Sequence, residues 1–136
     1  MDPASRHARA WLLLVGALAL HVADEALTGF LAFYNPLVLR LRSRLGFWPM
    51  PTFTFDIWLA GLILLVIALA LLMPAIRRGA ALAWPASWIF AIIMFGNGIA
   101  HLAGSVYYQR WLPGATSAPF LLIASVLLIN ATRSRR

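Results

Sequence analysis

Cysteine and lysine are absent from this chain of 136 residues, and only four residues are acidic. Without cysteine, disulfide bonds and thiolate chemistry are excluded. Charged residues make up 11% of the chain, whereas a soluble domain has about a quarter. Hydrophobic residues make up 62%, which is more than a 15.0 kDa protein can hide from water. Composition therefore argues against the soluble, disordered and disulfide-rich classes. It predicts one integral membrane domain over residues 1–136, with the lipid bilayer as its partner.

All eleven basic residues are arginines, and they give the chain a net charge of +7. In a soluble protein this excess would suggest nucleic-acid binding. The sequence has no basic face interleaved with base-stacking aromatic residues, so we expect no nucleic-acid partner. In a membrane protein the same arginines flank the hydrophobic spans and set their orientation.

Four apolar stretches predict an all-α fold, because a bilayer offers no hydrogen-bond partners to an irregular backbone. A spanning helix needs about 20 mostly apolar residues, and the fourth stretch is short but uncharged. We therefore predict a four-transmembrane-helix bundle with helices at about 11–33, 53–76, 82–106 and 115–131. The start of the first stretch also resembles a cleaved signal peptide. Its apolar character resumes after Glu25, which favours a retained span.

The arginines predict which side of the membrane holds the termini. Four spans leave both termini on one side, together with Arg6, Arg9, Arg77, Arg78, Arg133, Arg135 and Arg136. The other side holds Arg40, Arg42, Arg44 and Arg110. Seven arginines against four favour both termini in the cytoplasm. Between the first two spans, residues 37–45 wound as a helix carry leucines on one face and arginines beside it. This segment is either a short interfacial helix or a solvated loop.

Polar residues inside the spans are the candidates for a functional site, because each costs about 3 kcal/mol to insert. The set is His21, Asp24 and Glu25 in the first span, Asp56 in the second, and Asn97 and His101 in the third. At about 1.5 Å of rise per residue, all six lie between the midplane and the outer surface. His21 and Glu25 share a helix face, as do Asn97 and His101, since each pair is four residues apart.

Two imidazoles and neighbouring carboxylates suit several kinds of chemistry. His21, Glu25 and His101 are the candidate ligands for a divalent metal such as zinc or iron. The same residues with Asp24 and Asn97 suit acid–base catalysis on a lipid-like small molecule, or a proton relay. The plainer alternative is that they only hydrogen-bond the helices together.

The depth of each polar residue along its helix predicts which residues of the first and third spans contact one another. Glu25 lies closer in depth to His101, and Asn97 to His21. We expect Glu25–His101 to be the closest ionisable contact between helices, with His21 reached through Asn97 or water. The depth difference works against a direct contact between the two histidines, and so favours acid–base or relay chemistry over a compact two-histidine metal site.

Two further predictions concern residues outside this set. We expect Asp56 to cap the second span, where its charge complements the helix dipole and Arg110 is a possible partner; the alternative is a role in the site. We expect the fourth span only to pack, through a face of Ser117, Leu121, Ser125 and Leu128, with Asn130 near the cytoplasmic end. The site would then be built by the first three spans.

The motif His21-Val22-Ala23-Asp24-Glu25, followed by Asn97, His101, Tyr108 and Pro113-Gly114, resembles the HXXEE family. Its members are small, multi-span, mostly bacterial membrane proteins without an established reaction. The resemblance covers most of the chain and implies a location in the bacterial cell membrane. Asp24 stands where the family name has its first glutamate, which shortens that side chain by one methylene.

Three functions remain open on the sequence. The first is an enzyme or metal site acting on an apolar or amphipathic substrate. The second is a small proton-coupled transporter, and the third a structural or partner-binding membrane subunit. A pocket beside the polar residues would favour the first, a polar path to both faces the second, and a fully paired cluster without a cavity the third.

Overall fold

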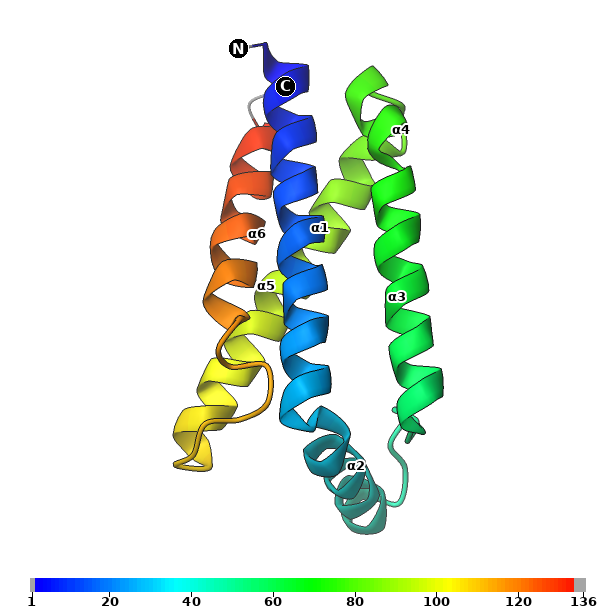
Figure 1. The fold of residues 1–136 in the computed structure, drawn as a ribbon, viewed down its shortest axis with the longest axis vertical. Coiled ribbons are helices and arrows are strands. Elements are labelled where there is room, and N and C mark those ends of the chain that lie inside the picture. The colour runs from blue at the N-terminus through cyan, green and yellow to red at the C-terminus, as the bar shows by residue number, and fades with distance from the viewer. Residues whose placement is uncertain (1, 134–136) are drawn as a thin grey trace.

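The computed structural model describes residues 2–133, which form six helices and no strand. The helices are α1 (Pro3–Thr28), α2 (Phe30–Leu45), α3 (Phe55–Leu71), α4 (Met73–Arg78), α5 (Ala83–Tyr107) and α6 (Ala118–Arg133). The long helices α1, α3, α5 and α6 run up and down the molecule in turn, so the start of α1 and the end of α6 lie at the same end (Figure 1). Arg135 and Arg136, which the orientation argument counts at this end, lie outside the described residues.

Helix α1 is defined by a cap at each end. At its start the Asp2 carboxylate accepts hydrogen bonds from the Ser5 backbone N–H at 3.0 Å and the Ser5 hydroxyl at 2.6 Å. These hydrogen bonds hold the pKa of Asp2 below its ordinary value. At its end Gly29 adopts a left-handed conformation, with φ of 79°. The first apolar stretch was expected to continue to residue 33; this boundary is wrong, because the chain turns at Gly29.

Helix α2 contains the segment expected as a short helix between the first two spans. The helix is confirmed but longer, since it starts at Phe30 and accommodates Pro36 in its interior. The Asn35 side-chain amide donates to the Phe53 carbonyl at 2.9 Å, and its oxygen accepts the Phe53 N–H at 3.1 Å. These bonds tie the segment before α3 to α2. A position in the headgroup plane stays a prediction.

Helices α3 and α4 together occupy the second predicted span. The chain bends at Leu72, just before Pro74, whose ring has no N–H to continue the hydrogen-bond ladder. Almost none of the side chains over residues 55–78 is buried, although the segment is strongly apolar. Its hydrophobic surface therefore faces outward, the reverse of a water-soluble helix.

Helix α5 confirms the third predicted span to within one residue at each end. Helix α6 starts at Ala118, three residues later than expected, because residues 115–117 form a turn. Its 16 residues extend about 24 Å, less than the roughly 30 Å hydrocarbon core. Within residues 2–133, three helices are long and apolar enough to cross a membrane: α1, α5 and α3 continued by α4. The four-span bundle remains a prediction.

The core forms where α6 packs against both α1 and α5. Leu14 of α1 and Leu121 and Leu128 of α6 are fully buried. Helices α1 and α5 each contact α6 far more than they contact one another. The direct contacts of α1 with α5 include His7 with Ser87 and Trp11 with Phe90, and, further along α1, the polar residues.

Candidate functional site

Helix α1 presents its three polar residues toward the interior. His21 and Glu25 are one turn apart, with 1% and 6% of their surfaces exposed, and Asp24 beside them is half-buried. Helix α5 brings Asn97 and His101, also one turn apart, to the same level, and His101 is buried. The two helical faces expected from the spacing therefore do meet.

The third side of the site is the turn between α5 and α6. The Ser105 hydroxyl of α5 accepts the Leu112 N–H at 3.1 Å and donates to the His101 carbonyl at 2.8 Å. This holds the chain close to α5 as it turns back. Pro113, Gly114 and Ser117 then lie against the two imidazoles.

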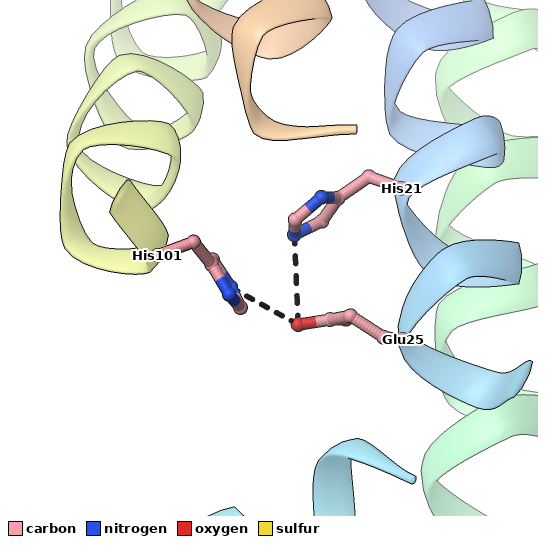
Figure 2. A group of neighbouring side chains, drawn as sticks. All are labelled: His21, Glu25 and His101. Carbon is pink, nitrogen blue, oxygen red and sulfur yellow. Dashed lines mark ion pairs between the residues drawn. The ribbon is translucent and has the colours of Figure 1, made fainter. Parts of the chain in front are cut away.

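Glu25 lies between the two histidines (Figure 2). Its Oε1 is 3.2 Å from Nε2 of His101 and 3.5 Å from Nε2 of His21. These are the two ion-pair contacts within residues 2–133, so the prediction that Glu25–His101 is the closest ionisable contact between helices is confirmed. The expected link from Asn97 to His21 is also confirmed, with Nδ2 and Nε2 3.3 Å apart.

The two histidines also contact one another directly. Their ring centroids are 4.7 Å apart, and the rings meet edge to face. The expectation that the difference in depth would keep them apart is wrong.

Hydrogen bonds to the Nδ1 atoms fix which nitrogen of each ring carries the proton. Nδ1 of His101 lies 2.7 Å from the Pro113 carbonyl, which can only accept, so this nitrogen donates. Nδ1 of His21 lies 2.8 Å from the Ser117 hydroxyl, whose own proton points to the Asp24 carboxylate at 2.8 Å. The Ser117 oxygen therefore accepts from His21. When either ring is neutral its Nε2 carries a lone pair on the side of Glu25, and that of His21 also accepts from the Asn97 amide at 3.3 Å.

The two Nε2 atoms and the Glu25 carboxylate thus converge on one point. The two Nε2 lone pairs and the Glu25 carboxylate repel one another unless a proton or a metal cation lies between them. The candidate ligand atoms of His21, Glu25 and His101 all lie within 4.8 Å of one another. Ligand atoms of a tetrahedral zinc ion lie about 3.3 Å apart, close to the two distances measured from Glu25. The two distances from Glu25 are therefore compatible with a cation of this size.

Asp24 and Ser117 form the outer support of His21. The Asp24 carboxylate accepts the Ser117 backbone N–H at 2.9 Å as well as its hydroxyl. A carboxylate that orients a histidine through its second nitrogen is typical of the surroundings of metal sites. Ser117 was expected only to pack, and that prediction is wrong. It lies just before α6, where its hydroxyl joins Asp24 to His21.

Gly114 is the second residue that the sequence did not assign to the site. Its φ is +83°, and a Cβ atom there would lie 2.8 Å from Nδ1 of His101 and 2.9 Å from Cε1 of His21. Only glycine lets the backbone approach both rings this closely. In the sequence, the Pro113-Gly114 pair indicates a turn between two helices but not a contribution to a site.

Neither Asp56 nor Asn130 takes part in the cluster. Asp56 lies in the first turn of α3 but is exposed; Thr54 is the N-cap residue and makes no side-chain cap hydrogen bond. Within residues 2–133 Asp56 forms no ion pair with Arg110, whose guanidinium lies over the Phe33 ring. Asn130 is exposed and faces away from the cluster, as expected. The site therefore combines α1, α5 and the turn before α6, and the expected contribution of the second span is wrong.

A pocket opens beside the cluster, between α2 and α5. Its volume is about 270 Å³, and Asn97 and His101 form its polar end. The Phe30 ring lies 5.8 Å from that of His101, centroid to centroid. The remaining wall is mainly apolar and aromatic, with Phe33, Tyr34, Leu37, Tyr108 and Leu112.

The fold and site define a small all-helical protein with helices of membrane-spanning length and a buried histidine–carboxylate cluster. Residues 11–129 match the family described as proteins of unknown function with an HXXEE motif, so the chain belongs to this family. No curated protein and no solved structure matches it. The matched region contains the whole cluster. Of the two motif acids, the second, Glu25, faces both histidines, and Asp24 in the first position supports His21 through Ser117.

Proposed function

We propose that the chain is an integral protein of the cell membrane, with both termini in the cytoplasm. The outward-facing apolar surface of α3 and α4 supports a lipid environment, because soluble proteins rarely expose so large an apolar surface to water. The arginine count, seven against four, supports the orientation. The cluster then lies in the outer half of the bilayer.

We further propose that His21, Glu25 and His101 hold one divalent cation of the zinc class and that the centre acts on an amphipathic substrate. The observation that carries this proposal is the convergence of two Nε2 atoms and a carboxylate on one point. Two histidines and one glutamate form a ligand set typical of catalytic zinc, which keeps a fourth position for water or substrate. A cation bound there would supply Lewis acidity and lower the pKa of a bound water.

The residues of the chain have distinct roles in this proposal. The Pro113 carbonyl and the Ser117 hydroxyl keep the Nε2 atoms of His101 and His21 directed at the cation. Asn97 lies between His21 and the pocket, where its amide can donate to an oxygen of the substrate. The aromatic wall of the pocket suits the apolar part of the molecule and excludes water.

Neither alternative function accounts for these contacts as well. A transporter needs a polar path to both faces, but a layer of buried apolar side chains lies between the cluster and the start of α1: Trp11, Leu14, Leu18 and Leu121. A structural role needs no more than one partner for each polar group, whereas here the Glu25 carboxylate meets the Nε2 atoms of two rings whose Nδ1 atoms already have partners. The adjoining pocket adds a place for a substrate, which a purely structural cluster does not need.

Metal analysis of the detergent-purified protein tests the proposal. We expect about one zinc ion per chain after equilibration with zinc and removal of excess, and little retained by His101→Ala. His7→Ala is the matched control, because His7 is also a buried histidine bonded to a serine, Ser87, but lies outside the cluster. Equal zinc content in wild type and His101→Ala would contradict the metal centre.

A further inference from the structure

A groove runs along the outer surface between α1 and α6, on a part of the molecule that the proposed metal centre does not use. Two pockets form it, and they share Leu13 and Leu127. The pocket near the chain ends has a volume of about 420 Å³ and is lined by Arg6, Arg9 and Asn130 together with apolar residues. The second has about 340 Å³ and is entirely apolar. The groove thus changes from cationic to apolar along its length.

The sequence positions of the lining residues explain why the groove is continuous. On α1 the positions 6, 9, 13, 16 and 20 recur every three or four residues, so they form one stripe. On α6 Phe120, Ile123, Leu127 and Asn130 form the facing stripe. The stripe on α1 extends about 21 Å, which exceeds the roughly 15 Å half-thickness of a hydrocarbon core.

The two arginines at the head of the groove are available to a ligand. Both are exposed, and neither forms an ion pair within the described chain. The nearest acid in sequence, Asp2, is occupied by two hydrogen bonds from Ser5. Guanidinium groups bind phosphate oxygens through paired N–H donors. Asn130 adds an amide donor opposite them.

We propose that this groove binds one anionic phospholipid, with its phosphate at Arg6 and Arg9 and an acyl chain along Leu13, Gly16 and Leu20. The order of the lining, cationic at the membrane surface and apolar toward the midplane, matches the order of groups in such a lipid. A partner helix would not require the arginines, and a soluble anion would not use the apolar pocket. The inference rests on the proposed membrane location but not on the metal centre.

The experiment measures which lipids stay bound to the full-length protein. Protein in nanodiscs of phosphatidylcholine with one-fifth phosphatidylglycerol is released into the gas phase, and retained lipid is identified by native mass spectrometry. We expect one phosphatidylglycerol per chain, retained in preference to phosphatidylcholine. In the double variant Arg6→Gln/Arg9→Gln the preference falls about 25-fold, because each arginine near an anionic surface contributes roughly fivefold.

Two matched controls separate a site from general charge. Arg77→Gln/Arg78→Gln makes the same change in net charge at the same end of the molecule but outside the groove, and we expect no more than a twofold effect. Gly16→Leu fills the apolar pocket, since no atom lies within 4 Å of the position of a Cβ there. It should lower retention at unchanged charge, whereas Gly61→Leu, equally open and outside the groove, should not.

Several results would overturn the lipid site. One is equal loss in the two arginine variants, which would indicate diffuse electrostatic attraction. Another is binding that is insensitive to Gly16→Leu, which would leave a phosphate contact alone. A third is a lipid-free dimer that Gly16→Leu breaks, which would make the groove an interface between copies of the chain. Zinc content, measured on the same samples, should stay at the wild-type value in every groove variant, so the two proposals fail separately.

Discussion

The orientation of each imidazole ring in the cluster is set by its hydrogen-bond partner rather than by burial alone. His21 and His101 are each oriented through Nδ1, by a side chain in one case and by a backbone carbonyl in the other. Both orienting groups come from the turn before α6. The position of this short turn therefore determines which atoms the two rings present to Glu25.

Replacing Gly114 with alanine tests this dependence. The new Cβ would press on both imidazoles, so we expect zinc affinity to fall about tenfold or more. Its left-handed backbone would also lower the free energy of unfolding by about 1–2 kcal/mol. Gly46→Ala is the control: its φ is +71°, but open space surrounds its Cβ position. It should lose similar stability and keep full zinc affinity, and a parallel loss of zinc would contradict the steric argument.

Removing the Ser117 hydroxyl tests the support given by Asp24. In Ser117→Ala, Nδ1 of His21 loses its acceptor, and zinc affinity should fall about 10–100-fold. Ser125→Ala is a suitable comparison, because the Ser125 hydroxyl is buried on α6 without a hydrogen-bond partner in the described chain. We expect that variant to bind zinc normally and to be no less stable than wild type. Titration with zinc would distinguish the two.

Among the helices, α6 determines how the other elements meet. It packs along both α1 and α5, and its first residues lie next to the turn that carries Ser117. Gly98 of α5 permits the close approach, because a Cβ there would lie 3.1 Å from the Ala118 carbonyl and 2.9 Å from the Leu122 side chain. The start of α6 thus lies directly against α5 near the site.

A pair of alanine variants in α5 measures this contact. Gly98→Ala should unfold more easily than Gly96→Ala by about 1–3 kcal/mol, since only the first would push α6 away. Gly96 has no neighbour within 4 Å of its Cβ position, and both replacements raise helix propensity equally. Reversible unfolding in mixed detergent micelles gives the two free energies. Equal stability would mean that α6 can shift at no cost.

The polar cluster lies near the end of α1 and the turn before α6, whereas the start of α1 and the end of α6 lie together at the opposite end of the molecule (Figure 1). Between them lies an apolar core, and much of the outer surface is apolar too. This distribution is expected for a protein that uses lipid as its solvent on the sides and water at its two ends. Helix α6 has 16 residues, and its crossing of the whole hydrocarbon core stays a prediction.

Single cysteines test the proposed topology against a background free of native thiols. We expect Ser43→Cys and Thr116→Cys to react with a membrane-impermeant maleimide in intact cells. Ala80→Cys and Asn130→Cys should react only after permeabilisation, because they lie toward the cytoplasmic end. All four positions are exposed. Labelling of Thr116→Cys and Asn130→Cys from the same side would show that α6 does not span.

The helices, and the helix faces that meet at the site, can be predicted from local patterns in the sequence. Apolar length and the absence of charge predict the helices, and the four-residue spacing of His21 and Glu25 and of Asn97 and His101 predicts which faces meet. Helical rise also predicts the Glu25–His101 contact, because depth along a helix is proportional to residue number. The start of α2 could have been read from Gly29, a residue suited to ending a helix.

The parts of the site that come from outside the helices depended on tertiary structure. Ser117 reads as a small packing residue and Gly114 as a turn residue until the turn is folded against α1 and α5. Asp56 lies in the first turn of α3, the position that the dipole argument expects, and takes no part in the cluster. Periodicity specifies the side of a helix that faces inward, but it carries no information on the path of a connecting turn. That path is set by the packing of α6 between α1 and α5, which brings residues more than 90 positions apart into hydrogen-bond contact.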